Sequence, residues 1–136
     1  MTTLVFLLLM ASAGDSVQYV PAKDVAVAMQ KNPPVPMINT EHYGIMAFHR
    51  TSAGQAEVHD KDTDVFYVID GKGTFVTGGK VVAGKTTALG ETRGTSIEGG
   101  QIHQLSKGDV ITIPAGMPHW FQKIDGSFTY FIVKVR

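Results

Sequence analysis

The alternation of apolar and polar residues becomes strand-like near residue 43. Before that point, residues 25–31 have weak helical character, and the prolines of Asn32–Pro36 forbid both a continued helix and a central strand. The sequence therefore predicts a short surface helix followed by an extended linker. After residue 43, short apolar runs predict eight strands, over 43–49, 56–59, 65–69, 73–76, 102–105, 110–113, 119–123 and 128–135.

Turn-forming residues separate most of these runs. The segments 70–73, 78–79 and 124–127 contain the glycines and aspartates that tight hairpins need. Residues 81–100 are less regular and contain five glycines, so a long loop is expected there, of the kind that serves as a lid or an interface. Eight short strands at this spacing predict an all-β protein closed into a sandwich or barrel.

The size, net charge and cysteine content of the chain limit the kinds of binding partner and chemistry to be expected. A chain of 136 residues is the size of one domain, and its twelve basic and twelve acidic residues give a formal net charge of zero. No long-range positive field is present to attract nucleic acid or anionic lipid, so we expect a small-molecule partner. The absence of cysteine excludes disulfides, thiol nucleophiles and thiolate metal ligands.

The N-terminus has two interpretations. Leu4 to Met10 is apolar and precedes Ala11-Ser12-Ala13, a pattern of small residues typical of a cleaved signal peptide, which would make the protein secreted or periplasmic. The run has no preceding basic residue and is too short to span a bilayer, so it equally suits a β-strand of a cytoplasmic protein, and stable membrane insertion is not expected. The expected organisation is residues 1–13 as signal or strand, 14–40 as an arm with a short helix, and 41–136 as the barrel.

The segment from Gly108 to His119 has a distinctive spacing of glycine, proline and histidine. Gly108-Asp109 turns the chain, residues 110–113 form a buried strand, and Pro114 and Gly116 form a bend that redirects His119. The segment matches the pattern G-x5-P-x-G-x2-H at every defined position and resembles the second motif of the cupin family. This resemblance implies a single double-stranded β-helix, or jelly-roll, cupin barrel in which His119 points inward and binds a metal.

A second segment, Glu57 to Gly71, resembles the first cupin motif more loosely. Six residues separate Asp64 from Gly71, as six separate the family's metal-binding glutamate from its glycine, so Asp64 takes the place of that glutamate. His59 is then the motif's second histidine, and Glu57 replaces the first. An alternative register makes His59 the first histidine and Lys61 the second, which gives a weaker site because protonated lysine is a poor ligand.

The resemblance nominates His59, Asp64 and His119 as metal ligands, a set suited to Fe(II), Mn(II), Ni(II) or Zn(II). Glu57 lies two residues before His59 and shares its strand face, so it is available for proton transfer. His103 lies two residues before the core residue Leu105 and is expected on the same inward face of the strand, so it is a second candidate for proton transfer. Simpler roles are a turn cap for Asp64, an ion pair with Lys61 for Glu57 and a structural role for each histidine.

Other residues receive structural interpretations. Phe66, Trp120 and Phe121 are expected in the core and the barrel wall, because large aromatic side chains fill barrel interiors. His42 and His49 lie in the first β segment with no motif around them, and we interpret both as structural. Arg93 lies in the irregular segment, where it is either a contact for an anionic substrate or a solvated surface charge.

Three classes of function follow. The first is a metal-dependent enzyme of the dioxygenase, lyase or isomerase type, and the second is a metal-free cupin that binds a sugar or another small polar metabolite. The third is a structural or storage-like assembly role. A homodimer fits all three, because small cupins pair barrels through sheet edges that are otherwise exposed.

Overall fold

The structure is a computed structural model, and it describes residues 16–136. The predicted signal peptide or N-terminal strand at residues 1–13 lies outside this part of the chain. Within residues 16–136, no helix has both the length and the apolar character needed to cross a membrane.

In the described part of the chain, one short helix precedes eleven strands. Their bounds are α1 Ala22–Met29, β1 Pro36–Asn39, β2 Tyr43–Arg50, β3 Ala56–His59, β4 Thr63–Thr77, β5 Lys80–Val82, β6 Lys85–Ala88, β7 Glu91–Gly94, β8 Ser96–Glu98, β9 Gln101–Ser106, β10 Val110–Ile113 and β11 His119–Val135. The predicted all-β class is confirmed, and the helix occupies roughly the predicted place.

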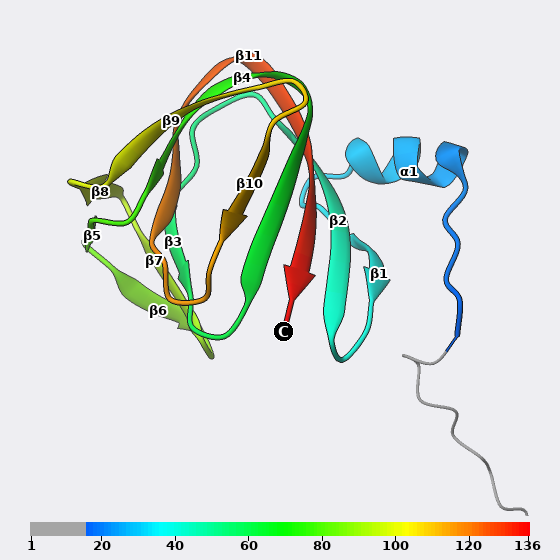
Figure 1. Cartoon of the computed structure of the whole chain (residues 1–136), viewed down its shortest axis with the longest axis horizontal. Coiled ribbons are helices and arrows are strands. Elements are labelled where there is room, and N and C mark those ends of the chain that lie inside the picture. The colour runs from blue at the N-terminus through cyan, green and yellow to red at the C-terminus, as the bar shows by residue number, and fades with distance from the viewer. Residues whose placement is uncertain (1–15) are drawn as a thin grey trace, which may run out of the picture.

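Nine of the strands form one curled antiparallel sheet. Its main order is β1-β2-β11-β3-β7-β6, and β4 joins it by pairing with β9, β10 and β11, while β5 and β8 form a separate ribbon. Figure 1 shows these strands curving around a central space, with α1 on the outside next to β2. The arrangement is a jelly-roll barrel, as the sequence predicts.

The two longest strands, β4 and β11, form the backbone of the barrel. They pair along nearly their whole length, from Thr63 opposite Val135 to Thr77 opposite His119. Each was expected to be two strands joined by a hairpin turn, which is wrong. Gly71 and Gly126 do have positive φ angles, of 95° and 75°, but the pairing between the strands only shifts register near them. Here the glycines form bulges that bend a continuous strand.

The prediction of a long loop at residues 81–100 is also wrong. This segment contains β6 and β7, which extend the main sheet, and most of the β5–β8 ribbon. All four residues of β6 are exposed, so the strand lacks the alternation of apolar and polar residues that reveals a half-buried strand in a sequence. The proline linker also ends in a strand, because Pro36 is the first residue of β1 at the sheet edge, where a missing N–H is tolerated.

An aromatic core fills one half of the barrel. Along β4, Asp64, Phe66 and Val68 alternate with more exposed residues, so they all point inward. The buried cluster comprises Phe66, Val68, Phe75, Leu105, Ile113, Phe121, Phe128, Tyr130 and Ile132. Trp120 is half-buried beside a smaller cluster and donates its indole N–H to the Gly54 carbonyl, at 2.9 Å. The predicted core role of Phe66 and Phe121 is confirmed.

Candidate metal site

The two histidines of the site are far apart in the sequence but come from adjacent strands. His59 ends β3 and His119 begins β11, and His119 pairs with Glu57 in the register of these strands. The bend before His119 depends on Gly116, whose φ of 79° is in the left-handed region. The backbone N–H of Gly116 donates to the His59 carbonyl at 2.7 Å, which ties the bend to the end of β3.

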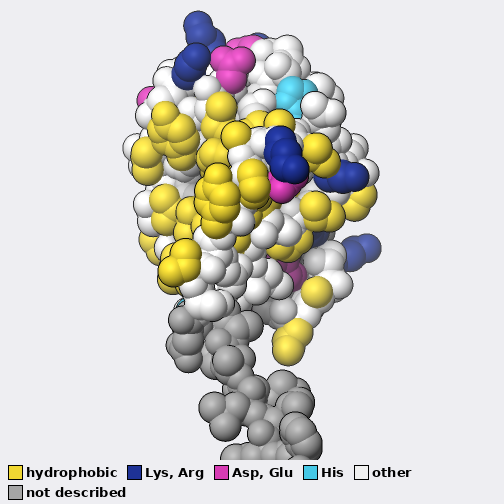
Figure 2. Space-filling view, turned by 90° about the vertical axis from the view of Figure 1, so that its right-hand side faces the viewer, with side chains coloured by type: hydrophobic (Ala, Val, Ile, Leu, Met, Phe, Trp, Pro, Cys, Tyr) yellow, Lys and Arg dark blue, Asp and Glu magenta, His cyan; other side chains and the backbone are white. Residues whose placement is uncertain are grey.

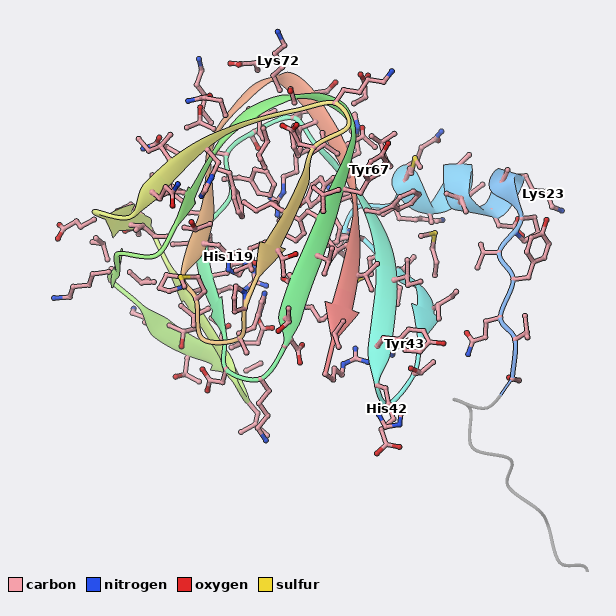
Figure 3. The ribbon with its side chains drawn as sticks, viewed as in Figure 1. Lys23, His42, Tyr43, Tyr67, Lys72 and His119 are labelled. Atoms are coloured by element: carbon pink, nitrogen blue, oxygen red, sulfur yellow. The ribbon has the colours of Figure 1, made fainter. Side chains whose placement is uncertain are left out.

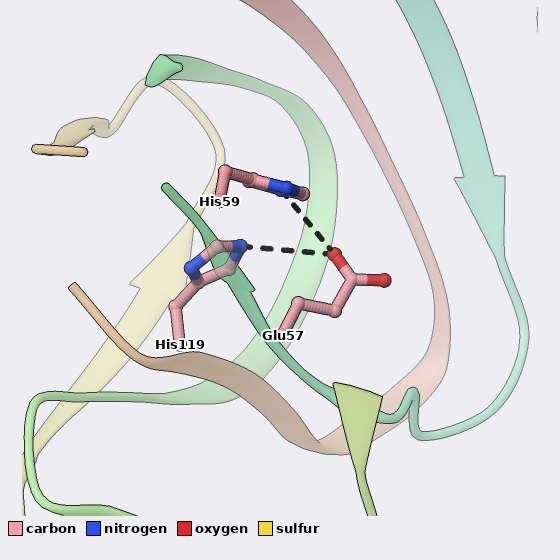
Figure 4. Close-up of side chains that lie close together, drawn as sticks. All are labelled: Glu57, His59 and His119. Atoms are coloured by element: carbon pink, nitrogen blue, oxygen red, sulfur yellow. Dashed lines mark ion pairs between the residues drawn. The ribbon is translucent and has the colours of Figure 1, made fainter. Parts of the chain in front are cut away.

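Both imidazoles direct Nε2 toward the same carboxylates. Glu57 Oε2 lies 3.8 Å from His59 Nε2 and 3.7 Å from His119 Nε2, and Asp64 Oδ2 lies 3.3 Å and 4.0 Å from the same two atoms. One ligand atom each from Glu57, His59 and His119 lies within 4.8 Å of the others (Figure 4). These three residues form the group with metal-ligand spacing, and Asp64 Oδ2 faces the same two ring nitrogens from beside it.

Asp64 is buried and Glu57 is half-buried, and each carboxylate is held by one cation that lines the cavity. Glu57 Oε1 forms an ion pair with Arg93 Nη1 at 2.8 Å, and Asp64 Oδ1 accepts a hydrogen bond from Lys134 Nζ at 2.7 Å. In both residues it is the other oxygen that faces the imidazoles. The cations therefore fix the orientation of the carboxylates and leave one oxygen of each directed at the imidazoles.

The far nitrogens of the imidazoles are also engaged. His119 Nδ1 lies 3.1 Å from the Met117 carbonyl, which can only accept, so the proton is on Nδ1 and Nε2 is left with a free lone pair when the ring is neutral. Glu91 Oε1 lies 2.8 Å from His59 Nδ1, an ion-pair distance without hydrogen-bond alignment. A carboxylate or carbonyl on the far nitrogen is the usual support for a histidine that binds a metal through the near one.

His119 Nε2 is buried, and among residues 16–136 it has no hydrogen-bond partner. Buried polar atoms are nearly always paired, because an unpaired one costs the free energy of its lost hydration. An unpaired ring nitrogen facing two carboxylate oxygens and a second imidazole is the donor geometry that a cation satisfies.

Electrostatics keep the carboxylates charged. Burial tends to raise the pKa of Glu57, but the interactions with His119 and Arg93 outweigh burial and hold that pKa below its usual value. For Asp64 burial acts in the same direction, and the contacts with His59 and Lys134 lower its pKa overall. Burial tends to lower the pKa of His59, but the contacts with Asp64 and Glu91 together outweigh burial, so the net shift is upward. The site therefore stabilises positive charge on the His59 ring and negative charge on the two carboxylates.

The cluster forms part of the wall of a cavity of about 480 Å³ inside the barrel. This volume is within the usual range for small-molecule sites, roughly 300–1,000 Å³. Aromatic residues also line the cavity, among them Phe48, Phe66, Phe121 and Tyr130, and residues 32–34 of the linker line it too. In Figure 3, His119 lies inside the barrel, whereas Lys23, His42 and Lys72 project from its outside.

The structure brings together four of the five residues predicted for the site: His59, Asp64, His119 and Glu57. The fifth, His103, is not among the described residues that line the cavity; its Nε2 lies 2.8 Å from the hydroxyl of Thr77. Glu57 does not pair with Lys61, which is exposed, but with Arg93. Arg93 is 40% exposed at its side chain and also lies 3.6 Å from Glu91, so it is a partly solvated charge that pairs with two carboxylates.

Three residues of the site were missed in the sequence: Glu91, Lys134 and Arg50. Glu91 lies opposite His59 in the β3–β7 register, and Lys134 lies opposite Asp64 in the β4–β11 register. No local motif marks either residue. The only available signal was that Lys134 lies two residues after the core residue Ile132. Alternate residues of a strand face the same side, so Lys134 also faces inward.

Comparison with known proteins agrees with this architecture. The sequence model of the cupin family matches residues 21–135. No sequence among curated proteins matches the chain.

Several solved structures share the fold at low sequence identity. A double-stranded β-helix protein from Klebsiella pneumoniae is 15% identical, with a TM-score of 0.55 over 82% of this chain and 85% of its own. A cupin protein from Bacteroides fragilis is 12% identical, with a TM-score of 0.52 over 75% of each chain. The DMSP lyase DddQ from Ruegeria pomeroyi is 14% identical, with a TM-score of 0.50; the match covers 71% of this chain but only 40% of the lyase.

Proposed function

This chain belongs to the cupin family, and we propose that it is a metal-dependent cupin that acts on a small molecule inside its barrel. The observation that supports this proposal most is the convergence of His59 Nε2 and His119 Nε2 on the free oxygens of Glu57 and Asp64. The unpaired, buried Nε2 of His119 supports it further, because a bound cation supplies the missing partner.

His59 and His119 are the proposed nitrogen ligands, with Asp64 and Glu57 as the carboxylates. Two imidazoles and carboxylate oxygens suit Fe(II), Mn(II), Ni(II) or Zn(II), and the absence of thiolates makes Cu(I) unsuitable. When bound, such an ion polarises a substrate oxygen or activates dioxygen, which leaves dioxygenase, lyase and isomerase chemistry open.

The remaining residues of the site have distinct proposed roles. Arg93 and Lys134 hold the carboxylates in place and offset their charge, since each cation occupies one carboxylate oxygen. Glu91 orients the ring of His59 from its far side. Where Asp64 serves as the carboxylate ligand, Glu57 is free to move a proton to or from a substrate held against His119, the role first assigned to it.

A metal-free binding protein for a sugar or another small polar metabolite is the second candidate. The observation that favours it is the ion pairing itself, because Arg93 and Lys134 already provide counter-charges for Glu57 and Asp64. In that case the imidazoles and carboxylates form hydrogen bonds to ligand hydroxyl groups instead.

Elemental analysis tests the first candidate against the second. The full chain is purified without a metal-affinity column, and its metal content is compared with that of the His59→Ala and His119→Ala variants. We expect close to one metal ion per native chain and a large loss in both variants. No uptake of Fe(II), Mn(II), Ni(II) or Zn(II) by native protein, even after reconstitution, would replace the enzyme proposal with the metal-free binding protein.

We also propose that the chain forms a homodimer. Val110 on β10 lies opposite Tyr67 on β4, and their exposed fractions are 64% and 49%. This apolar pair lies next to a strand edge that no other strand of residues 16–136 covers. Figure 2 shows many hydrophobic side chains on the face seen from the α1 side. Light scattering after size-exclusion chromatography should give twice the mass of the chain, and the Val110→Lys variant should shift the protein toward monomer. A monomer at tens of micromolar would reject the dimer.

A further inference from the structure

Arg50, at the end of β2, lines the same cavity as the histidines and carboxylates. Its guanidinium carbon lies 5.0 Å from the ring centre of Phe121, 5.8 Å from that of Phe48 and 5.9 Å from that of Tyr130. Its Nε donates to the Tyr130 hydroxyl at 2.7 Å. Aromatic faces and one hydrogen bond therefore fix the planar group in a single orientation.

Arg50 differs from the other cations of the cavity in having no anionic partner. Among residues 16–136, Arg93 and Lys134 form ion pairs with carboxylates that line the cavity, whereas no ion pair involves Arg50. In this part of the chain its Nη groups form no hydrogen bond either, since its only one is through Nε. Arg50 is half-buried against three rings, and its two adjacent Nη groups are available to donate hydrogen bonds to a ligand.

We propose that Arg50 binds the oxyanion of a small amphipathic organic anion, such as a carboxylate. A guanidinium presents parallel N–H groups whose spacing matches the two oxygens of a carboxylate. The assignment of this anion as the substrate rests on the function proposed above; the binding of the anion does not.

The walls of the cavity define the rest of the ligand. Phe66 lies between the two polar regions, with its ring centre 5.1 Å from that of Tyr130 and 6.5 Å from that of His119. Met46 and Ile132 also line the cavity. A ligand that reaches from Arg50 toward His119 must therefore place a short apolar segment over Phe66, with an anionic group at one end and a polar group at the other.

Butyrate and its neutral isostere butyramide test this inference. Each is titrated into the full chain at pH 7 and constant ionic strength, and the Nε–Hε resonance of Arg50 is followed by NMR, assigned from its loss in Arg50→Gln. Butyrate should shift the resonance saturably and butyramide should not. Inorganic phosphate, which lacks the apolar segment, should bind more weakly than butyrate.

Three variants distinguish a specific contribution of Arg50 to butyrate affinity from a general effect of the protein's net charge. Binding of butyrate, measured by calorimetry, should weaken about 10- to 100-fold in Arg50→Gln, in keeping with the loss of a charge-assisted hydrogen bond. Arg50→Lys keeps the charge but not the paired donors, so its affinity should be intermediate. Arg136→Gln changes the net charge equally, but Arg136 contacts Asn39 and Thr40 outside the cavity. The affinity of this variant for butyrate should therefore equal that of native protein. Circular dichroism confirms that each variant is folded.

The titrations are made first on chelator-treated protein and then with one equivalent of Zn(II). Arg50-dependent binding of butyrate without uptake of zinc would support the anion site while rejecting the metal-dependent function. Uptake of zinc, combined with butyrate binding that is absent or equal in native and Arg50→Gln protein, would overturn the anion site and leave the metal site standing.

Discussion

The imidazole rings of His59 and His119 lie 5.1 Å apart, centre to centre, with their planes tilted by 51°. One ring follows Glu57 on β3 and the other follows the Gly116 bend, and the Gly116 N–H joins the two backbones directly. The two rings do not stack, and their Nε2 atoms face the same carboxylates. This geometry favours binding of a shared ligand over a packing role for the rings. This distinction can be tested by truncating one ring.

The His119→Ala variant should remain folded and lose the metal. Its side chain contacts Phe66 and Phe75 at ring distances of 6.5 and 6.0 Å, so we expect a loss of about 1–3 kcal/mol in the free energy of unfolding. Affinity for Zn(II), measured by calorimetry, should fall at least about 100-fold. His42→Ala, on an exposed turn, is the control and should change neither quantity. An unfolded His119→Ala protein would show that the ring is structural.

The Lys134→Met variant should be destabilised by about 3 kcal/mol, because it leaves the Asp64 carboxylate buried without its cation. Replacing both residues, in Lys134→Met/Asp64→Leu, should recover part of this loss. The matched control is Lys123→Met, whose pair with Asp125 is well exposed and should contribute less than about 1 kcal/mol. Urea denaturation measures all three variants. Equal stability of Lys134→Met and Lys123→Met would contradict the role of Lys134 as the partner of a buried charge.

Substitution of Gly71 should be far more damaging than substitution of Gly116. Both residues have positive φ, so an alanine at either position costs about 1–2 kcal/mol of backbone strain. At Gly71 an added Cβ would also overlap the Ser127 carbonyl on the paired strand β11, whereas at Gly116 the space is open. Thermal unfolding followed by circular dichroism should rank Gly71→Ala well below Gly116→Ala. Similar melting temperatures would mean that the bulge between β4 and β11 adjusts freely.

The phenol of Tyr130 should ionise well above the usual pKa of a tyrosine. Burial raises its pKa to about 12, against a smaller lowering by Arg50. A pKa that is higher in the folded protein stabilises it below pH 10, and this contribution is lost as pH rises from about 10 to 12. Absorbance at the tyrosinate band should show this late step, which Tyr130→Phe should remove. An unchanged late step in that variant would assign it to another tyrosine.

Short strands were predictable where turn residues bound them on both sides. The expected strands at 56–59 and 110–113 have the same bounds in the structure. Gly71 and Gly126 indicated hairpins for the same reason and gave wrong boundaries, because a positive φ serves a bulge as well as a turn. Only the pairing of β4 with β11 distinguishes these cases, and that pairing is between residues far apart in the sequence.

The part of the site that lies within the two sequence motifs could be predicted from the sequence. The resemblance to the two cupin motifs nominated His59, Asp64 and His119, and each motif spans two successive strands and the turn between them. Glu91 and Lys134 enter the site through cross-strand pairing, which depends on how the barrel closes; the only nearby signal is that Lys134 lies two residues after the core residue Ile132. Arg50 was missed for the same reason, since its aromatic partners come from β11 as well as from its own strand.

Anomalous X-ray diffraction from crystals of the full chain grown with one equivalent of Zn(II) tests the central claim most directly. The account predicts an anomalous peak at the zinc edge about 2.0–2.1 Å from Nε2 of both His59 and His119, with a carboxylate oxygen of Glu57 or Asp64 at about 2.0–2.2 Å. No peak between these side chains, or a peak only at the protein surface, would contradict it.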